Sequence, residues 1–173
     1  MNKALFLDRD GVINLDTGYP SAREEIVFLE HIFSLCRAAK EQGYLLLVVT
    51  NQAGIARGYY TEEDFEALMQ WMQEQFTAQG CALDGWYYCP HHPEFGVGEY
   101  RTACECRKPK PGMLLTAAKE WDIDMRRSIL IGDKASDINA ANAAGVGNAW
   151  QVTQPGKLRE VMQQFSELSE VAL

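Results

Sequence analysis

Hydrophobic and polar positions along the chain follow two patterns, short continuous apolar runs and longer stretches in which apolar residues recur with helical spacing. The short runs predict strands over Lys3–Asp8, Tyr44–Thr50, Gly85–Cys89, Ser128–Gly132 and Val146–Trp150. The longer stretches predict helices over Leu29–Gln42, from Thr61 onward, and over Pro111–Trp121, Asp137–Ala144 and Pro155–Ser166. Because strands alternate with helices, we expect an α/β fold with a doubly wound, mostly parallel sheet, formed by residues 1–173 as a single domain.

The helix that begins at Thr61 has the clearest pattern. Acidic residues occupy its first turn, where they suit the positive end of the helix dipole. Its inner stripe is expected to consist of Phe65, Leu68, Met69, Met72 and Phe76.

Composition narrows the class of protein. Of the 173 residues, 47% are hydrophobic and 23% are charged, which is the balance of a soluble globular protein. The formal net charge of −8 disfavours general binding to nucleic acids or anionic membranes, because phosphate groups repel a net-acidic surface. No apolar run approaches the length of a transmembrane helix, and Asp8 comes too early for a signal-peptide core. We therefore expect a cytoplasmic protein.

Polar and acidic residues follow three of the predicted strands. Asp8 and Asp10 come after the first, Thr50 ends the second, and Asp133 follows the fourth. Doubly wound sheets bind ligands at these strand ends, and residues two apart on an extended chain point to the same side. Carboxylates gathered there would repel one another without a hard cation, for which Mg²⁺ is suited. The chemistry indicated is phosphoryl transfer, with one carboxylate as nucleophile and a second as acid and base. The alternative is an inert acidic turn or a fragment of a calcium loop.

The five cysteines divide into two groups. Cys36 lies on a predicted core stripe and Cys81 follows the glycine that ends a helix, so both are expected to be free thiols. The other three lie in or next to residues 90–110, which have no periodicity and are rich in proline, glycine, cysteine and histidine. A loop of this length in a compact domain needs something to hold it.

Metal binding would meet that need. Cys-Pro-His-His at residues 89–92 and Cys-Glu-Cys at residues 104–106 offer four ligands, enough for a tetrahedral zinc site. A structural role is favoured, because four protein ligands leave no open position for water. These residues alone do not separate His91 from His92, and three reduced surface thiols are the alternative. His31 is remote in sequence and is expected on a helix surface.

The strand-end motifs resemble those of the haloacid dehalogenase superfamily of phosphatases. They are Asp8-Arg-Asp-Gly-Val12, Thr50-Asn51, Lys108 and Gly-Asp133-Lys134, and their order and spacing fit over essentially the whole chain. The resemblance implies that Asp8 is the nucleophile and Asp10 the general acid and base, while Thr50 and Lys108 stabilise the phosphoryl group. It also implies that Asp8, the main-chain carbonyl of Asp10, and Asp133 bind Mg²⁺.

A second set of segments is similar to the D-glycero-D-manno-heptose 1,7-bisphosphate 7-phosphatase family. The segments are Tyr88–Pro93, Cys104–Pro109, Pro111–Met113, Asn51–Gly58 and Asp16–Tyr19. This resemblance assigns zinc to Cys89, His91, Cys104 and Cys106. It implies substrate-binding roles for Asp16, Thr17, Gly18, Tyr19, Thr50, Asn51, Gln52, Ala53, Arg107, Lys108 and Lys134. Lys110 is left as an ordinary basic surface residue.

The function expected from this resemblance is Mg²⁺-dependent removal of the 7-phosphate through an aspartyl-phosphate, in nucleotide-heptose synthesis for lipopolysaccharide. The chain leaves no room for a separate cap domain, and a monomer acting on a small phosphorylated sugar is expected. Histidinol-phosphate phosphatase is the nearest rival, although residues 92–103 form a longer loop than that relative would have. A polynucleotide phosphatase is disfavoured by the acidic charge, and a zinc-stabilised interaction module is the non-enzyme alternative.

Overall fold

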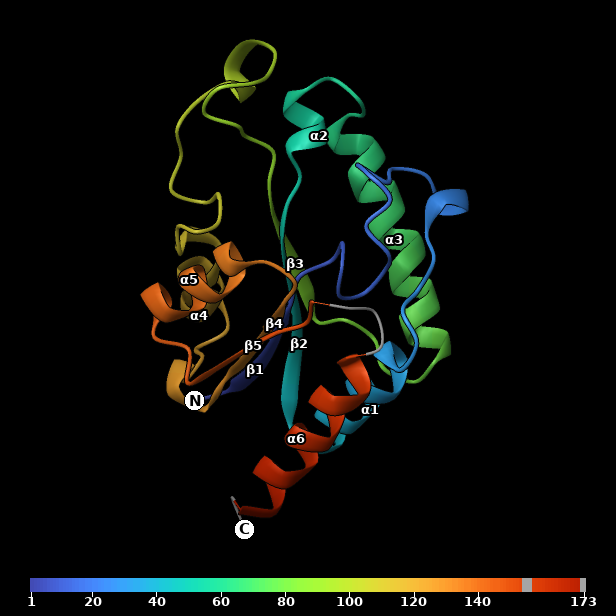
Figure 1. Ribbon diagram of the computed structural model, residues 1–173, viewed down its shortest axis with the longest axis vertical. Coiled ribbons are helices and arrows are strands. Elements are labelled where there is room, and N and C mark those ends of the chain that lie inside the picture. The colour runs from blue at the N-terminus through green and yellow to red at the C-terminus, as the bar shows by residue number, and fades with distance from the viewer. Residues whose placement is uncertain (154–156, 172–173) are drawn as a thin grey trace.

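The protein is described by a computed structural model that covers residues 1–153 and 157–171, with side chains of the last helix as far as Phe165. A five-stranded parallel sheet in the order β3-β2-β1-β4-β5 forms its centre (Figure 1). The strands are β1 (Lys3–Leu7), β2 (Tyr44–Asn51), β3 (Gly85–Cys89), β4 (Ile129–Gly132) and β5 (Asn148–Gln151). The expected doubly wound, mostly parallel sheet is confirmed.

Helices cover both faces of the sheet (Figure 1). One face carries α1 (Ile32–Glu41), α3 (Glu62–Ala78) and α6 (Leu158–Val171). The other face carries α4 (Gly112–Glu120) and α5 (Ala135–Ala144). A short helix, α2 (Ala53–Ala56), follows β2, and single 3₁₀ turns occupy Arg23–Glu25, Gly98–Tyr100 and Met125–Arg127.

Alternating strand residues supply the two halves of the core, because successive side chains of a strand point to opposite faces. Leu5 and Leu7 of β1 pack in the cluster on the α1, α3 and α6 side, while Ala4 and Phe6 pack in the cluster on the α4 and α5 side. All four are fully buried, which explains why β1 is a continuous apolar run. The predicted inner stripe of α3 is buried as well: Phe65, Leu68, Met69, Met72 and Phe76.

Several helix starts differ from the predicted ones. The first helix begins at Ile32 rather than Leu29, because the preceding residues are held in an extended bridge in which Leu29 N–H donates to the Ile13 carbonyl oxygen at 2.9 Å. His31, expected on the helix surface, is instead the N-cap, with φ of 74°. Pro111 is likewise an N-cap.

Two further differences concern the C-terminal half. The helix predicted from Asp137 begins two residues earlier, at Ala135, because the Asp137 carboxylate caps the preceding backbone N–H groups. The last helix begins at Leu158 and extends to Val171, past the predicted end at Ser166. Its predicted start at Pro155 lies outside the described residues. The four-residue helix α2 was not predicted, since a single turn carries no periodicity to detect.

The strand order places a site at one edge of the sheet. Successive crossovers lead from β1 outward to β2 and β3, and the chain then returns to β4 on the other side of β1. Ligands of doubly wound sheets bind at such a switch point, outside the carboxyl ends of the strands. The segments after β1, β2 and β4 therefore meet where the sequence motifs are.

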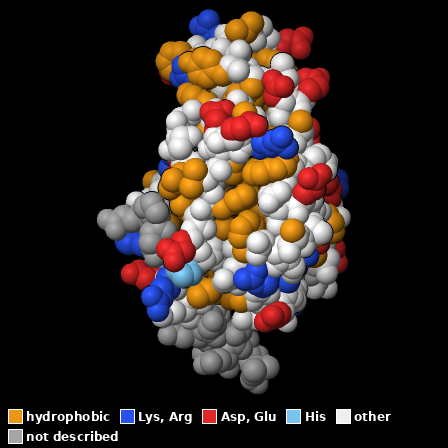
Figure 2. All heavy atoms as spheres, turned by 90° about the vertical axis from the view of Figure 1, so that its right-hand side faces the viewer, with side chains coloured by type: hydrophobic (Ala, Val, Ile, Leu, Met, Phe, Trp, Pro, Cys, Tyr) orange, Lys and Arg blue, Asp and Glu red, His pale blue; other side chains and the backbone are white. Residues whose placement is uncertain are grey.

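The outer surface is mixed in character. On the face formed by α3 and α1, Figure 2 shows a strip of hydrophobic side chains with acidic and basic side chains on both sides. Within residues 1–153 and 157–171, no helix combines the length and the apolar character needed to cross a membrane.

The core predicts a sharp contrast between two substitutions. Phe76→Ala should lower the free energy of unfolding by about 3–5 kcal/mol, because a fully buried ring leaves a cavity. Leu115→Ala, at a side chain that is 51% exposed on α4, should change it by less than about 0.5 kcal/mol. Urea unfolding of both variants measures the difference, and equal losses would contradict the placement of α3 against the sheet.

Candidate active site

Asp8 stands at the carboxyl end of β1 and is only 8% exposed. Its Oδ1 accepts a hydrogen bond from the backbone N–H of Arg9 at 2.9 Å and one from Lys108 Nζ at 3.0 Å. The chain turns sharply at Gly11, which has φ of +93°. A Cβ at Gly11 would lie 2.1 Å from Asp133 Oδ2, so only glycine lets this turn pass so close to the carboxylate that follows β4.

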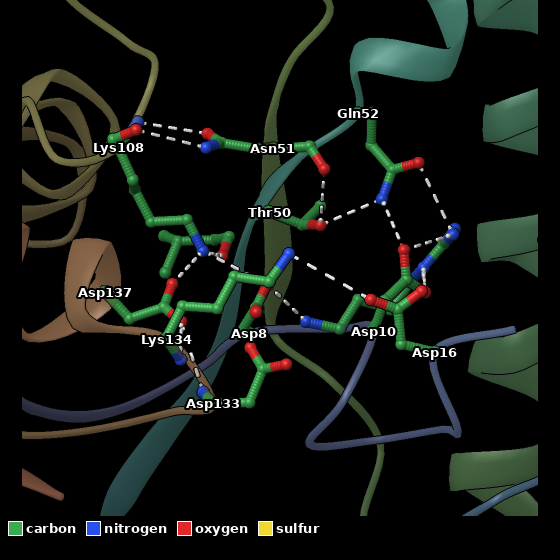
Figure 3. A network of polar contacts seen from close by, with 12 residues as sticks. Asp8, Asp10, Asp16, Thr50, Asn51, Gln52, Lys108, Asp133, Lys134 and Asp137 are labelled. Carbon is green, nitrogen blue, oxygen red and sulfur yellow. Dashed lines mark hydrogen bonds and ion pairs between the residues drawn. The ribbon is translucent and has the colours of Figure 1, made fainter. Parts of the chain in front are cut away.

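Lys108 links three elements of the fold through its ammonium group (Figure 3). Besides Asp8, Nζ donates to the Val49 carbonyl oxygen at 2.9 Å and to Asp137 Oδ1. Asn51 holds the backbone of Lys108 on both sides, since Oδ1 accepts from Lys108 N at 3.0 Å and Nδ2 donates to the Lys108 carbonyl oxygen at 3.2 Å. The predicted substrate residue Asn51 thus also positions the cation.

Asp137 is a site residue that sequence reasoning missed. It lies in the first turn of α5, is 2% exposed, and its Oδ2 accepts from the backbone N–H groups of Asp133 at 3.1 Å and Lys134 at 3.0 Å. Gly132 makes room for it, because a Cβ there would lie 2.2 Å from the Asp137 Cβ. The signal in the sequence is an acidic residue four positions after Asp133, at the place where the pattern predicts the first residue of the helix.

Burial sets the charge balance of this cluster. It raises the pKa of Asp8 well above its usual range, although the Lys108 ammonium opposes the shift. Burial also raises the pKa of Asp133. Burial alone would lower the pKa of Lys108, but the carboxylates of Asp8 and Asp137 raise it. The cluster therefore has a surplus of buried acidic groups for its single buried ammonium.

The carboxylates fit a divalent cation. One oxygen each from Asp8, Asp133 and Asp137 lie within 4.8 Å of one another. Asp133 Oδ1 is buried and has no hydrogen-bond partner among the described residues. Both Asp137 oxygens already accept hydrogen bonds, which leaves Asp8 and Asp133 as the carboxylates available to Mg²⁺. That the main-chain carbonyl of Asp10 also binds Mg²⁺ stays a prediction.

The Asp10 carboxylate has its own hydrogen-bond partners, which differ from those of Asp8 and Asp133. Its Oδ1 accepts from Arg9 Nε at 2.9 Å and from Asn14 Nδ2 at 3.0 Å, and its Oδ2 accepts from Arg9 Nη2 at 3.2 Å. Gln52 Nε2 approaches Oδ2 at 3.4 Å and donates to Thr50 Oγ1 at 2.9 Å. Asp10 still lines the same cavity as Asp8, so the two carboxylates can act on one bound molecule.

That cavity has a volume of about 550 Å³. Of the predicted substrate residues, it is lined by Asp16, Gly18, Tyr19, Thr50, Asn51, Gln52, Ala53, Arg107, Lys108 and Lys134. Thr17 is exposed and is not among the lining residues, so its contact with substrate stays a prediction. Tyr60, Pro109, Ser136 and Asp137 line the cavity without having been predicted.

Four predicted zinc ligands come together beside this cavity. Sγ of Cys106 lies 2.9 Å from Sγ of Cys89, 3.4 Å from Sγ of Cys104 and 3.4 Å from Nδ1 of His91. All four ligand atoms lie within 4.8 Å of one another, and the cysteines are free thiols. Three sulfurs and one imidazole nitrogen are the donors that zinc prefers in closed tetrahedral sites.

The structure separates the two neighbouring histidines. His92 Nδ1 accepts from the backbone N–H groups of Glu94 and Phe95, both at 3.1 Å, so it serves the turn that follows. His91 faces the cysteines. Arg107 Nη1 donates to the His91 carbonyl oxygen at 3.4 Å, which ties the first cavity-lining cation to the cluster. Lys110 is exposed and contacts Glu105, as expected of a surface residue.

Comparisons with known proteins identify relatives of the chain. Residues 105–154 match the family model described as HAD-hyrolase-like. The chain is 56% identical to a D-glycero-alpha-D-manno-heptose-1,7-bisphosphate 7-phosphatase of Burkholderia mallei over 84% of this chain and 77% of the relative. It is 54% identical to the D-glycero-beta-D-manno-heptose-1,7-bisphosphate 7-phosphatase of Vibrio cholerae over 83% of this chain and 77% of the relative.

A solved structure is also similar over most of the chain. The D,D-heptose 1,7-bisphosphate phosphatase of B. bronchiseptica, complexed with magnesium and phosphate, superposes with a TM-score of 0.79 at 30% identity. The similarity covers 94% of this chain and 86% of that one. The resemblance drawn from the motifs is confirmed.

The position of Asp137 predicts a defect in both stability and turnover. Asp137→Asn should cost about 1–3 kcal/mol of unfolding free energy, because a buried acceptor of two backbone N–H groups and an ammonium is altered. Phosphatase activity should fall by about 10- to 100-fold as Lys108 shifts.

Asp64→Asn is the matched control. Asp64 accepts from the backbone N–H of Thr61 at 2.9 Å at the start of α3 and is not among the residues that line the cavity. Its loss should reduce stability by about 1 kcal/mol and leave kcat unchanged. An Asp137 variant that loses stability but keeps full kcat would contradict a role for Asp137 in holding Lys108.

Proposed function

This chain belongs to the D-glycero-D-manno-heptose-1,7-bisphosphate 7-phosphatase family of haloacid dehalogenase-like hydrolases, and we propose that it removes the 7-phosphate of that sugar bisphosphate. One observation carries the proposal: the buried carboxylate Asp8 shares a cavity with three cationic side chains, Arg107, Lys108 and Lys134. A nucleophile surrounded by cations suits a substrate that carries two phosphate groups. The cavity volume of about 550 Å³ is that of a site for a small molecule.

The chemistry assigns a separate role to each carboxylate. The Asp8 carboxylate attacks phosphorus, so that an Asp8–phosphorus bond forms as the bond from phosphorus to the sugar oxygen breaks. Asp10 gives its proton to that leaving oxygen. Asp10 then accepts a proton from the water that attacks the aspartyl-phosphate, which releases inorganic phosphate and restores Asp8.

Other residues stabilise the charge that develops on the phosphoryl oxygens. Lys108 is already 3.0 Å from Asp8, so its ammonium lies beside the group that receives the phosphoryl. Thr50, buried at the end of β2, offers its hydroxyl on the same cavity wall. Mg²⁺ would be held by Asp8, the main-chain carbonyl of Asp10, and Asp133, and when bound it supplies positive charge next to these oxygens.

Zinc is proposed as a structural ion held by Cys89, His91, Cys104 and Cys106. Four protein ligands leave no position for a reacting water. The supporting geometry is that Arg107 and Lys108 directly follow Cys106 in the chain, so that ordering the cluster orders two cavity-lining cations.

The cellular setting follows from the substrate. A doubly phosphorylated heptose is an intermediate on the way to nucleotide-activated heptose for lipopolysaccharide, and its charges confine it to the cytoplasm, where we place the reaction. The chain is proposed to act as a monomer and a single domain of residues 1–173. Substrate selection is assigned to the loop at residues 16–19 and to the zinc loop at residues 89–106, whose residues line or flank the cavity.

Phosphate release from three substrates tests the proposal. Both anomers of D-glycero-D-manno-heptose 1,7-bisphosphate should be hydrolysed faster than histidinol phosphate, and chelation of Mg²⁺ should abolish turnover. Asp8→Asn should reduce kcat by about 10⁴-fold or more while circular dichroism stays unchanged. A clear preference for histidinol phosphate would overturn the substrate assignment. Unaltered function of Asp8→Asn would favour an interaction module.

Metal content tests the zinc proposal. Protein purified under reducing conditions should contain about one zinc ion per chain. Cys106→Ser should lose the zinc and about 10- to 100-fold in activity, because Lys108 follows two residues later. Cys36→Ser, at a buried thiol in α1, is the matched control and should keep both. Full activity of a zinc-free protein would contradict the proposed role of the ion.

A further inference from the structure

Arg9 is the largest fully buried side chain of the described protein, yet the reaction above gives it no task. It stands between the nucleophile and the general acid and base. We propose that Arg9 is a positioning residue that holds the Asp10 carboxylate for proton transfer to and from the reacting oxygens. The proposal rests on the phosphatase function proposed above.

The contact between Arg9 and Asp10 has the fork geometry of a paired guanidinium and carboxylate. Nε donates to Oδ1 at 2.9 Å and Nη2 donates to Oδ2 at 3.2 Å. Two parallel hydrogen bonds fix the plane of a carboxylate, which a single bond leaves free to rotate. The backbone N–H of Arg9 meanwhile donates to Asp8 Oδ1 at 2.9 Å. One residue therefore sets the orientation of both catalytic carboxylates.

The guanidinium is itself held from several sides. Nη2 also donates to the Pro20 carbonyl oxygen at 3.0 Å and to Gln52 Oε1 at 3.4 Å, and Tyr60 donates its hydroxyl hydrogen to the same Gln52 oxygen. The guanidinium carbon Cζ lies over the ring of Phe65, 5.5 Å from its centre. These contacts come from the loop after β1, the turn after β2 and helix α3, so Arg9 is fixed relative to the whole site.

One feature of Arg9 carries a cost. Its Nη1 is buried and has no hydrogen-bond partner among the described residues. A buried unpaired donor lowers the stability of the folded protein, so stability alone would favour a smaller or apolar side chain at this position. The fork that holds Asp10 needs the planar guanidinium, which a lysine cannot reproduce. The presence of arginine despite its unpaired Nη1 supports a role for Arg9 in the reaction.

Two substrates that differ in their leaving group can be used to measure the role of Arg9. A sugar alkoxide leaves only when Asp10 protonates it, whereas p-nitrophenolate leaves without a proton. The quotient kcat/KM reports the steps up to the first bond cleavage, before Asp10 acts as a base. Misplacing Asp10 should therefore affect the sugar phosphate strongly and p-nitrophenyl phosphate weakly.

The experiment measures kcat/KM of the Mg²⁺-loaded protein for heptose 1,7-bisphosphate and for p-nitrophenyl phosphate. Arg9→Lys and Arg9→Met should each lose about 100-fold on the sugar phosphate, the size expected for a displaced catalytic group. The ratio of the two kcat/KM values should move by roughly tenfold or more towards p-nitrophenyl phosphate. Equal losses on both substrates would overturn the proposal.

Two further variants guard against a trivial defect in folding. Asn14→Ser removes the donor at 3.0 Å from Asp10 Oδ1 without touching Arg9, and it should shift the ratio in the same direction by a smaller factor. Met72→Ala, in the core stripe of α3, is the control that loses stability without shifting the ratio. If the Arg9 variants do not fold, the Asn14 variant decides: an unshifted ratio overturns the proposal.

Measurements on the wild-type protein distinguish a wrong substrate assignment from a wrong role for Arg9. A wild-type protein that does not hydrolyse heptose bisphosphate contradicts the substrate assignment only, and the ratio is then measured with an alkyl phosphate that it does hydrolyse. A wild type without activity on any alkyl phosphate overturns both proposals.

Discussion

The buried ammonium group of Lys108 is the point on which the site depends. It donates to Asp8 at the end of β1, to the Val49 carbonyl of β2 and to Asp137 of α5, and it is only 4% exposed. Carboxylates removed from water in this way are costly unless a cation accompanies them. Without Lys108, the ends of β1 and α5 would bring uncompensated negative charges together. Lys108 follows Cys106 by two residues, so the proposed zinc loop at residues 89–106 leads directly into the site.

Two carboxylates near the end of β1 are each stabilised by contact with a buried cation. Asp8 is paired with Lys108, and Asp10 is paired with Arg9. The two carboxylates thus contact different buried cations, although Lys108 is shared with Asp137. Separate partners suit the proposed mechanism, in which Asp8 attacks as a carboxylate while Asp10 gives up and regains a proton. Asp133 is the third carboxylate of the group formed with Asp8 and Asp137, and this group needs positive charge beyond that of Lys108.

The sequence could predict those parts that depend on local pattern or on fold topology. Strands β1 and β2 are continuous apolar runs because both of their faces are buried, and Asp8 and Thr50 follow from the rule that sites lie at strand ends. The sequence pattern could not predict contacts between side chains that are far apart in the chain. Asp137 is recognisable only through its contact with Lys108, and Arg9 looks like a surface residue until its burial is known. Likewise, the orientation of a ring, not its position in sequence, distinguishes His91 from its neighbour.

The cysteine and histidine cluster, which is the proposed zinc site, lies next in the chain to the cations of the candidate active site. Asn51, at the end of β2, fixes the backbone of Lys108 through two hydrogen bonds, and Cys106 of the cysteine and histidine cluster lies two residues before Lys108 in the chain. The cation is therefore anchored on one side by the sheet and on the other by this cluster. Arg107 sits between these anchors and faces the cavity. The proposed zinc ion would in this way order Arg107 and Lys108 at the cavity wall, because metal binding fixes the backbone of the loop that carries its ligands.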